Sequence, residues 1–273
     1  MLNYLSPRGE SGSPIKLFKT GVAGELDLRL GNIRTNFEKG FPRVYPGACT
    51  RKSNVMKLVC FGPSLENTWT EIEKTEGDIW TLSGANRYLF ERGIKADFHL
   101  EADPREHKSR LLEGSCPETT YLIASRCSPR MFDVLSGRKI FVFHIAGDKD
   151  EKKILDELYH GEFLIPPAWT MGNTALIIGI LLGYEKFRIF SMDGSFKDGK
   201  QHPVEHPNEW PSSEIFTVDK GLQTERKFIS HHSHIIAAEC FIKIMEKQPY
   251  GTFEFIGDGM IPYMYQCYTK DYR

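Results

Sequence analysis

The sequence predicts an α/β fold of the Rossmann-like type, with a mostly parallel sheet and helices on both faces. From Val55 onward, short apolar stretches with the composition of β-strands alternate with helical stretches. Most of the expected strands run into turns that contain glycine or an acidic residue. The chain has 273 residues, 40% of them hydrophobic, which is enough apolar material for a sizeable core.

The elements follow one another in a regular order. Strands are expected at residues 55–61, 78–82, 98–102, 120–124, 139–144, 187–192 and 253–256. Helices are expected at residues 66–74, 86–92, 173–182 and 232–248, and Gly93 and Gly183 follow two of them as C-terminal caps. Alternation of this kind is typical of a parallel sheet that is covered on both faces.

Two parts of the chain lack a strong period. Residues 1–54 contain recurring glycine and proline, and we expect an N-terminal extension without a role in chemistry. Residues 55–273 then form the Rossmann-like, nucleotide-binding catalytic domain. Within it, residues 197–213 contain three prolines and no period, which predicts a surface loop or lid.

Composition excludes several classes of protein. The formal net charge of -1 argues against a global electrostatic grip on nucleic acid, although a local basic groove stays open. None of the six cysteines forms a CxxC pair, which favours free thiols in a reducing compartment. The sequence has neither the layout of a signal peptide nor an apolar stretch of membrane-spanning length. We therefore expect a cytoplasmic protein with no membrane span.

Ligands of parallel sheets bind beyond the carboxyl ends of the strands, so the turns after the strands are the candidate sites. The turn Gly62-Pro63-Ser64-Leu65 connects a strand to a helix. A glycine there allows close approach of a ligand, and Ser64 near a helix start favours an anion. The alternative is a tight turn in which Ser64 caps the helix.

Two further turns have the same ambiguity. In Ser83-Gly84-Ala85-Asn86, Asn86 either caps the next helix or bonds a base or sugar across the cleft. The segment from Thr170 to Thr174 precedes the most apolar helix, and its hydroxyls and amides, with Gly172, could form a second anion site. Thr170 or Asn173 acting as a simple N-cap is the competing interpretation.

Carboxylates and histidines provide the candidate catalytic groups. Asp103 ends the third strand, where it could hold a ribose, a metal or a reacting hydroxyl, or be a turn residue before Pro104. Asp193 ends the sixth strand, and His202 and His206 follow it in the expected lid as candidate acids or bases. Both histidines could instead be solvated loop residues. The group His231-His232-x-His234 is interpreted as the start of a helix in preference to a metal site.

Together these motifs resemble a superfamily. The segments GPSL, ANRYLFERGIKADFHLEADP and TMGNTALIIGILLGYEKFRIFSMDGSF are similar to 6-hydroxymethylpterin diphosphokinase-like proteins, motility-associated flagellin glycosyltransferases and bacterial lipo-oligosaccharide sialyltransferases. The resemblance covers roughly residues 55–200, with a weaker match at 253–264. It implies a nucleotide in the cleft, the GPSL turn and Asn86 on the nucleotide half, residues 170–174 near the phosphate, and His202, with His206 second, as base.

The diphosphokinase branch implies a different role for two carboxylates. There Asp103 and Asp193 would hold Mg²⁺ and the triphosphate. Pro104 stands where the thiamin-type diphosphokinase pattern has a second acidic residue, which weakens the two-metal interpretation.

The favoured function is therefore a glycosyltransferase that uses a nucleotide-activated sugar, with a cytidine-activated acidic sugar as one donor considered. The alternatives are an ATP- and Mg²⁺-dependent diphosphokinase and a nucleotide-binding protein without catalysis. The acceptor stays open among a glycan, a protein, a small molecule and modified DNA, as does the oligomeric state.

Overall fold

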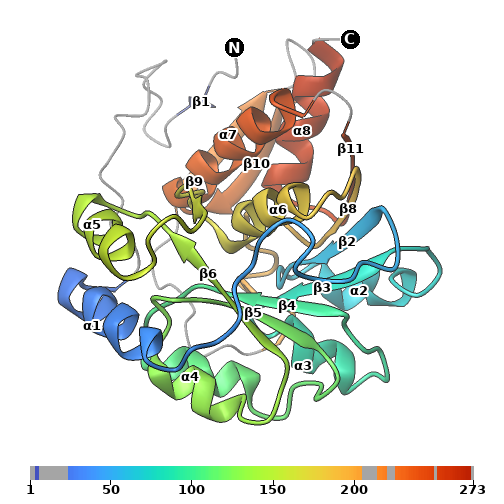
Figure 1. The fold of residues 1–273 in the computed structure, drawn as a ribbon. Helices are drawn as coiled ribbons and strands as arrows, with labels where there is room; N and C mark the ends of the chain where they lie inside the picture. The colour runs from blue at the N-terminus through green and yellow to red at the C-terminus, as the bar shows by residue number, and fades with distance from the viewer. Residues whose placement is uncertain (1–3, 6–23, 205–213, 220–224, 249–250, 272–273) are drawn as a thin grey trace.

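An eight-stranded, wholly parallel sheet forms the centre of the protein (Figure 1). The computed structural model describes residues 4–5, 24–204, 214–219, 225–248 and 251–271. The strand order is β11-β8-β2-β3-β4-β5-β6-β7. Because all strands run in the same direction, their carboxyl ends lie along one edge. The predicted α/β, Rossmann-like fold is confirmed.

The strands form where the sequence is rich in apolar residues. They are β2 (Val55–Val59), β3 (Asp78–Leu82), β4 (Phe98–Glu101), β5 (Thr120–Ala124), β6 (Ile140–Ile145), β7 (Leu164–Ile165), β8 (Lys186–Phe190) and β11 (Thr252–Ile256). Strands β3 and β5 are buried at every position, as expected for strands covered on both faces. In register, Leu58 of β2 pairs with Trp80 of β3 and Ile189 of β8, so β2 lies inside the sheet.

Helices cover the sheet and connect its strands. They are α1 (Leu26–Phe37), α2 (Leu65–Thr68), α3 (Ala85–Phe90), α4 (Pro129–Val134), α5 (Lys149–Leu158), α6 (Met171–Leu181), α7 (His232–Glu246) and α8 (Met260–Asp271), with 3₁₀ turns η1 (Trp69–Glu71) and η2 (Glu106–Leu112). Gly93 and Gly183 adopt positive φ angles after α3 and α6, as predicted for C-terminal caps. Within the part of the chain that the structure describes, no helix could cross a membrane.

The helix predicted at residues 66–74 is wrong as one continuous element. The structure has the short α2 followed by η1. The physical reason is the buried Lys57 of β2, whose ammonium donates hydrogen bonds to the carbonyls of Ile72 (2.9 Å) and Thr75 (2.8 Å). These carbonyls turn toward the sheet to satisfy a buried cation, so they do not continue a helix.

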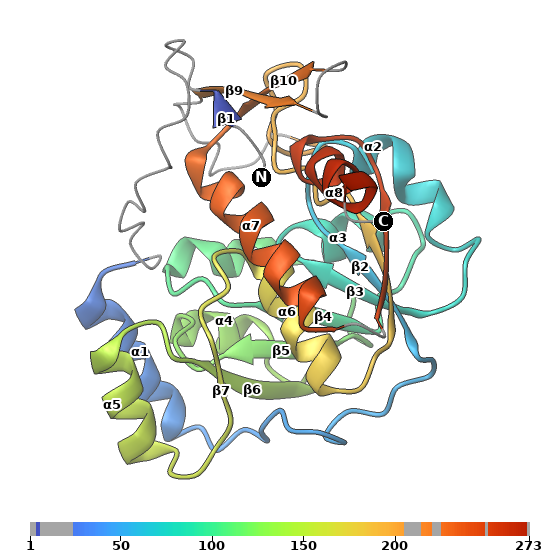
Figure 2. The ribbon, with the colours of Figure 1, turned by 90° about the horizontal axis from the view of Figure 1, so that it is seen from above.

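A second, antiparallel sheet was not predicted. It has the order β1 (Tyr4–Leu5), β9 (Glu214–Asp219) and β10 (Glu225–Ser230), and it leads directly into α7 (Figure 2). Part of the lid predicted at residues 197–213 falls outside the described residues, and so does His206.

Helix α1 lies beside α5 and anchors two loops at the carboxyl edge of the sheet (Figure 1). The amide of Asn32 donates to the carbonyls of Pro104 (3.0 Å) and Arg126 (2.9 Å). The amide of Asn36 donates to those of Ser125 and Cys127, both at 2.8 Å. Apolar periodicity did not predict this helix, because its buried face is mostly polar. The division between residues 1–54 and 55–273 stays a prediction.

The anchoring of α1 can be tested with Asn36→Ala. This change leaves two buried carbonyls unsatisfied, so we expect a loss of about 2 to 3 kcal/mol in the free energy of unfolding, measured by urea denaturation. The matched control is Thr35→Ala, whose hydroxyl bonds the Gly31 carbonyl on the exposed face of the same helix and should cost at most about 0.5 kcal/mol. Equal losses for the two variants would contradict the anchoring role.

Candidate functional site

A pocket of about 360 Å³ opens at the carboxyl edge of the sheet. Its walls come from the segments that follow β3, β4, β5 and β6 and from the start of α6. This is the place where parallel sheets bind ligands. The residues that line it include Ser83, Glu101, Ala102, Asp103, Lys108, Arg126, Ile145, Gly147, Trp169, Thr170 and Thr174.

Two residues on the pocket wall have a strained backbone. Ser83 and Trp169 adopt φ angles of 50° and 66°, in the left-handed region that residues other than glycine rarely occupy. Such conformations cost about 1 to 3 kcal/mol each and cluster at functional sites. Trp169 is 45% exposed and lines the pocket, so it brings an accessible aromatic residue to the pocket wall. A flat ring of a ligand could stack on it.

Two cationic side chains, Lys108 and Arg126, line the pocket. The Lys108 ammonium makes no hydrogen bond or ion pair with a described residue. Arg126 donates one side-chain hydrogen bond, from Nε–H to the carbonyl of Ala102 at 3.1 Å. Helix α6 begins at the pocket, and the first-turn amides of a helix attract anions. The arrangement favours a negatively charged ligand.

Glu101 supplies a titratable carboxyl group to the same pocket. It ends β4, is buried, and its Oε1 accepts the backbone N–H groups of Ala102 (2.9 Å) and Asp103 (3.1 Å). Burial raises the pKa of Glu101 to about 7, against the opposing field of Lys108. Both protonation states are therefore populated near neutral pH, as proton transfer requires. The candidate catalytic residue predicted from this strand end was Asp103 and not Glu101, although both are carboxylates there.

Asp103 lines the pocket as a paired anion. Its carboxylate accepts hydrogen bonds from Arg105 through Nε (2.9 Å), Nη2 (2.6 Å) and the backbone N–H (3.0 Å). Burial acts to raise the pKa of Asp103, but the bonds to Arg105 outweigh it and the pKa lies below the ordinary value. Asp103 therefore stays ionised near neutral pH, and it can orient a ligand through its charge.

Asp193 lies outside the pocket, beneath the Gly62-Pro63-Ser64-Leu65 turn. Its carboxylate accepts the Ser64 N–H (2.7 Å) and the Ser64 hydroxyl (2.6 Å). A Cβ on Gly62 would lie 2.6 Å from Asp193 Oδ2, so only glycine fits there. Burial raises the pKa of Asp193 to about 6, and the bonds from Ser64 oppose that rise. The polar groups of Ser64 are thus committed inside the protein, and none of the four turn residues lines the pocket.

Asn86 is also committed inside the protein. Its amide nitrogen donates to the hydroxyls of Thr81 (3.3 Å) and Thr119 (3.2 Å), and its oxygen accepts the N–H of Cys116 (2.8 Å). The expectation that Asn86 caps a helix is wrong, because the N-cap of α3 is Gly84. Asn86 instead ties α3 to the segment that precedes β5.

The segment before α6 reaches the pocket as predicted from its position. Thr170 is confirmed as the N-cap, since its hydroxyl accepts the N–H of Asn173 at 3.3 Å. Asn173 turns inward and donates to the carbonyls of Ala168 (3.1 Å) and Ala237 (2.8 Å). Gly172 packs against Met192, where a Cβ would lie 2.9 Å from the Met192 Cε. The structure therefore brings Ser83, Asp103, Thr170 and Thr174 together, and places Asn86 and Asp193 elsewhere.

His202 lies over the end of β2. Its Nδ1–H donates to the carbonyl of Phe61 at 2.7 Å, and its ring stacks on the Phe61 ring with centroids 5.3 Å apart. In the neutral ring, this tautomer leaves the lone pair on Nε2, as a base requires. Phe61 in turn packs against Gly84, the neighbour of Ser83 on the pocket wall. His202 itself does not line the pocket.

The histidines at the start of α7 do not form a metal site with other described residues. His231 is the buried N-cap residue of α7, with its ring 6.2 Å from that of His234. Among residues that the structure describes, no group of three or more His, Cys, Asp or Glu could hold a metal ion.

Comparisons with known proteins give a family and a fold. The family model described as 6-hydroxymethylpterin diphosphokinase MptE-like matches residues 30–199, a span that begins inside α1. No curated protein matches the sequence. The structure of MAf glycosyltransferase from Magnetospirillum magneticum AMB-1 is similar, with a TM-score of 0.62 and 14% identity, over 92% of this chain and 42% of that chain. A mammalian sialyltransferase has a TM-score of 0.42 and 11% identity, over 94% of this chain and 90% of that chain.

The environment of Glu101 predicts a pH-dependent stability. The folded pKa of about 7 lies above the ordinary 4.5, so the contribution of Glu101 is complete below pH 4.5 and is lost as the pH rises through 7. Glu101→Gln is neutral at every pH and removes this loss. Between pH 4.5 and 8, wild type should lose up to about 3 kcal/mol of unfolding free energy relative to Glu101→Gln in urea titrations.

The control for this measurement is the exposed Glu113→Gln, which should follow the wild-type pH profile. Parallel profiles for wild type and Glu101→Gln would mean that Glu101 does not titrate in this range.

Proposed function

The chain belongs to the 6-hydroxymethylpterin diphosphokinase MptE-like family, and we propose that it is a glycosyltransferase that uses a nucleotide-activated sugar as donor. The observation that carries this proposal is the pocket at the carboxyl edge of the sheet. There an open aromatic face, two cationic side chains, the first turn of α6 and a titratable carboxyl group meet. The chain spans about two fifths of the MAf glycosyltransferase structure, which shares the fold.

The pocket has complementary groups for each part of such a donor. The phosphate would bind at the first turn of α6, between the amides near Gly172 and the ammonium of Lys108. The base would stack on Trp169, and the hydroxyls of Thr170 and Ser83 would bond polar groups of the donor. Ser64 and Asn86 would act on nucleotide binding through the loops that they hold, because their polar groups are already bonded.

Transfer of the sugar requires a base and a stabilised leaving group. The acceptor oxygen bonds to the anomeric carbon, the bond from that carbon to the phosphate oxygen breaks, and the electron pair leaves with the phosphate. His202 is proposed to take the acceptor proton on Nε2. The α6 first turn and Lys108 would stabilise the departing phosphate, and Asp103 would orient the acceptor hydroxyl.

The description of the family favours a second candidate, an ATP- and Mg²⁺-dependent diphosphokinase. The two carboxylates that would hold Mg²⁺ do not fit that role together. Asp103 is bonded to Arg105, while Asp193 is buried against Ser64 and does not line the pocket. A nucleotide-binding protein without catalysis is the third candidate, and it predicts binding without turnover.

Nucleotide binding is the first test. Calorimetry with cytidine, uridine, guanosine and adenosine nucleotides should find at least one that binds more tightly than about 1 mM. Trp169→Ala should weaken binding of that nucleotide by about tenfold, because stacking of a base on an aromatic ring contributes about 1 to 3 kcal/mol. Trp69→Ala, in η1 and away from the pocket, is the control. If wild type binds none of the four, the proposed function fails.

Donor hydrolysis, with water as acceptor, separates transfer from diphosphokinase chemistry. His202→Ala should lower turnover by roughly 10² to 10⁴ and leave nucleotide affinity nearly intact. The exposed His160→Ala is the control and should keep full turnover. A diphosphokinase would instead tolerate His202→Ala and lose activity in chelator or on Asp103→Ala. That second pattern would reverse the order of the two candidates.

A further inference from the structure

Arg126 is a largely buried cation with most of its hydrogen-bonding capacity unused. It follows β5, lines the pocket, and its side chain is 12% exposed. Nε donates to the Ala102 carbonyl, whereas Nη1 is buried and forms no hydrogen bond, and Nη2 has no described partner. A buried guanidinium is costly unless it is paired, so its unused donors need an explanation.

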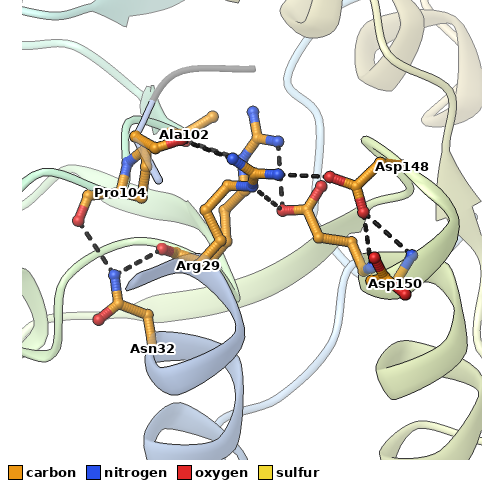
Figure 3. Close-up of polar contacts among 9 residues, drawn as sticks. Arg29, Asn32, Ala102, Pro104, Asp148 and Asp150 are labelled. Atoms are coloured by element: carbon orange, nitrogen blue, oxygen red, sulfur yellow. Dashed lines mark hydrogen bonds and ion pairs between the residues drawn. The ribbon is translucent and has the colours of Figure 1, made fainter. Parts of the chain in front are cut away.

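The acidic partner closest to Arg126 is shared with another arginine. Glu151, in the first turn of α5, is fully buried, and its Oε1 lies 3.6 Å from Arg126 Nη1 but accepts a 3.0 Å hydrogen bond from Arg29 Nε. Arg29, on α1, also pairs with Asp148 and donates to the carbonyl of Gly24 at 2.6 Å (Figure 3). Arg29 therefore takes the closer contacts with both carboxylates.

This sharing leaves the charge of Arg126 incompletely compensated. Asp148 is turned toward α5, where its Oδ1 accepts the N–H groups of Asp150 (3.1 Å) and Glu151 (2.9 Å) as the N-cap. A Cβ on Gly147 would overlap Glu151 Oε2 and come within 3.2 Å of Arg126 Nη1, so the loop packs directly on the ion pair. The guanidinium is held in place at the pocket wall, and because Nη1 is buried, the exposed 12% of the side chain belongs to its other atoms.

We propose that Arg126 binds an anionic group of the substrate, and that Glu151 and Arg29 are positioning residues that hold its guanidinium toward the pocket. The anion has at least two oxygens, since a planar guanidinium matches a phosphate or a carboxylate. The inference rests on the proposed function, in which the donor contributes a phosphate and an acidic sugar would add a carboxylate. Helix α1 then takes part in the site through Arg29.

Calorimetry with three probes tests the binding role. Wild type, Arg126→Gln and Arg126→Lys are titrated with inorganic pyrophosphate, with CMP and with CMP-N-acetylneuraminate. Arg126→Gln should weaken binding by about tenfold or more, and Arg126→Lys by less, because hydrogen bonds to charged groups are among the stronger ones. The control is Arg188→Gln, a paired arginine on β8 outside the pocket.

The pattern of losses identifies the anion. Losses for pyrophosphate and CMP indicate that Arg126 binds phosphate, and a loss confined to CMP-N-acetylneuraminate indicates the sugar carboxylate. Nucleotide binding that Arg126→Gln leaves unchanged overturns the inference and keeps the proposed function. Loss of pyrophosphate binding in a protein that binds no nucleotide supports the inference and removes the proposed function. A wild type that binds none of the probes overturns both.

A double-mutant cycle tests the positioning role. If Glu151 acts through Arg126, Glu151→Gln weakens probe binding several-fold in the wild-type background. It then has no further effect on probe binding in the Arg126→Gln background. A merely structural role predicts the same loss in both backgrounds and would overturn this part of the inference. Thermal unfolding shows whether Glu151→Gln is folded. If it is not, Arg29→Lys, which keeps the charge on α1, replaces it in the same double-mutant cycle.

Discussion

The loops at the carboxyl edge of the sheet are held by one constraint: buried polar groups must find partners. Asp193 satisfies it with Ser64 and so fixes the turn after β2. The amide nitrogens of Asn32 and Asn36 satisfy it by donating to the backbone after β4 and β5. Arg126 satisfies it only in part, because its Nη1 is buried without a hydrogen bond, and it lines the pocket beside Lys108 and Glu101.

Apolar runs in the sequence were sufficient to place most strands of the parallel sheet and the turns that meet at its carboxyl edge. They could not reveal α1, because that helix buries Arg29, Asn32 and Asn36 and gains its stability from partners far away in the chain. Nor could motifs show which polar groups are already used. Ser64 and Asn86 have the residue types of ligand contacts, yet their bonds run inside the protein. Arg126 stands outside the motifs and Glu101 lies inside one beside Asp103, so the pocket is what identifies both as site residues.

Three carboxyl groups near the ends of the strands differ in protonation because their surroundings differ. Burial raises the pKa of both Glu101, to about 7, and Asp193, to about 6, while the bonds from Arg105 keep that of Asp103 below its ordinary value. Only Glu101 combines a raised pKa with a place in the pocket. The Asp193 carboxylate accepts two hydrogen bonds from Ser64 and so stabilises the turn after β2. Environment, more than residue type, therefore sets the protonation of these three carboxyl groups.

In the proposed mechanism, a bound anion would act differently on Glu101 and on His202. Negative charge near Glu101 disfavours its ionised form, so the pKa of Glu101 would rise further above neutral when a phosphate occupies the pocket. In the complex, Glu101 would then be a hydrogen-bond donor and a poor base. His202 lies outside the pocket wall, where its Nδ1–H donates to the Phe61 carbonyl, so it is farther from that charge than Glu101 is. In the proposed transfer, His202 would therefore accept the proton, and Glu101 would donate a hydrogen bond to the bound anion.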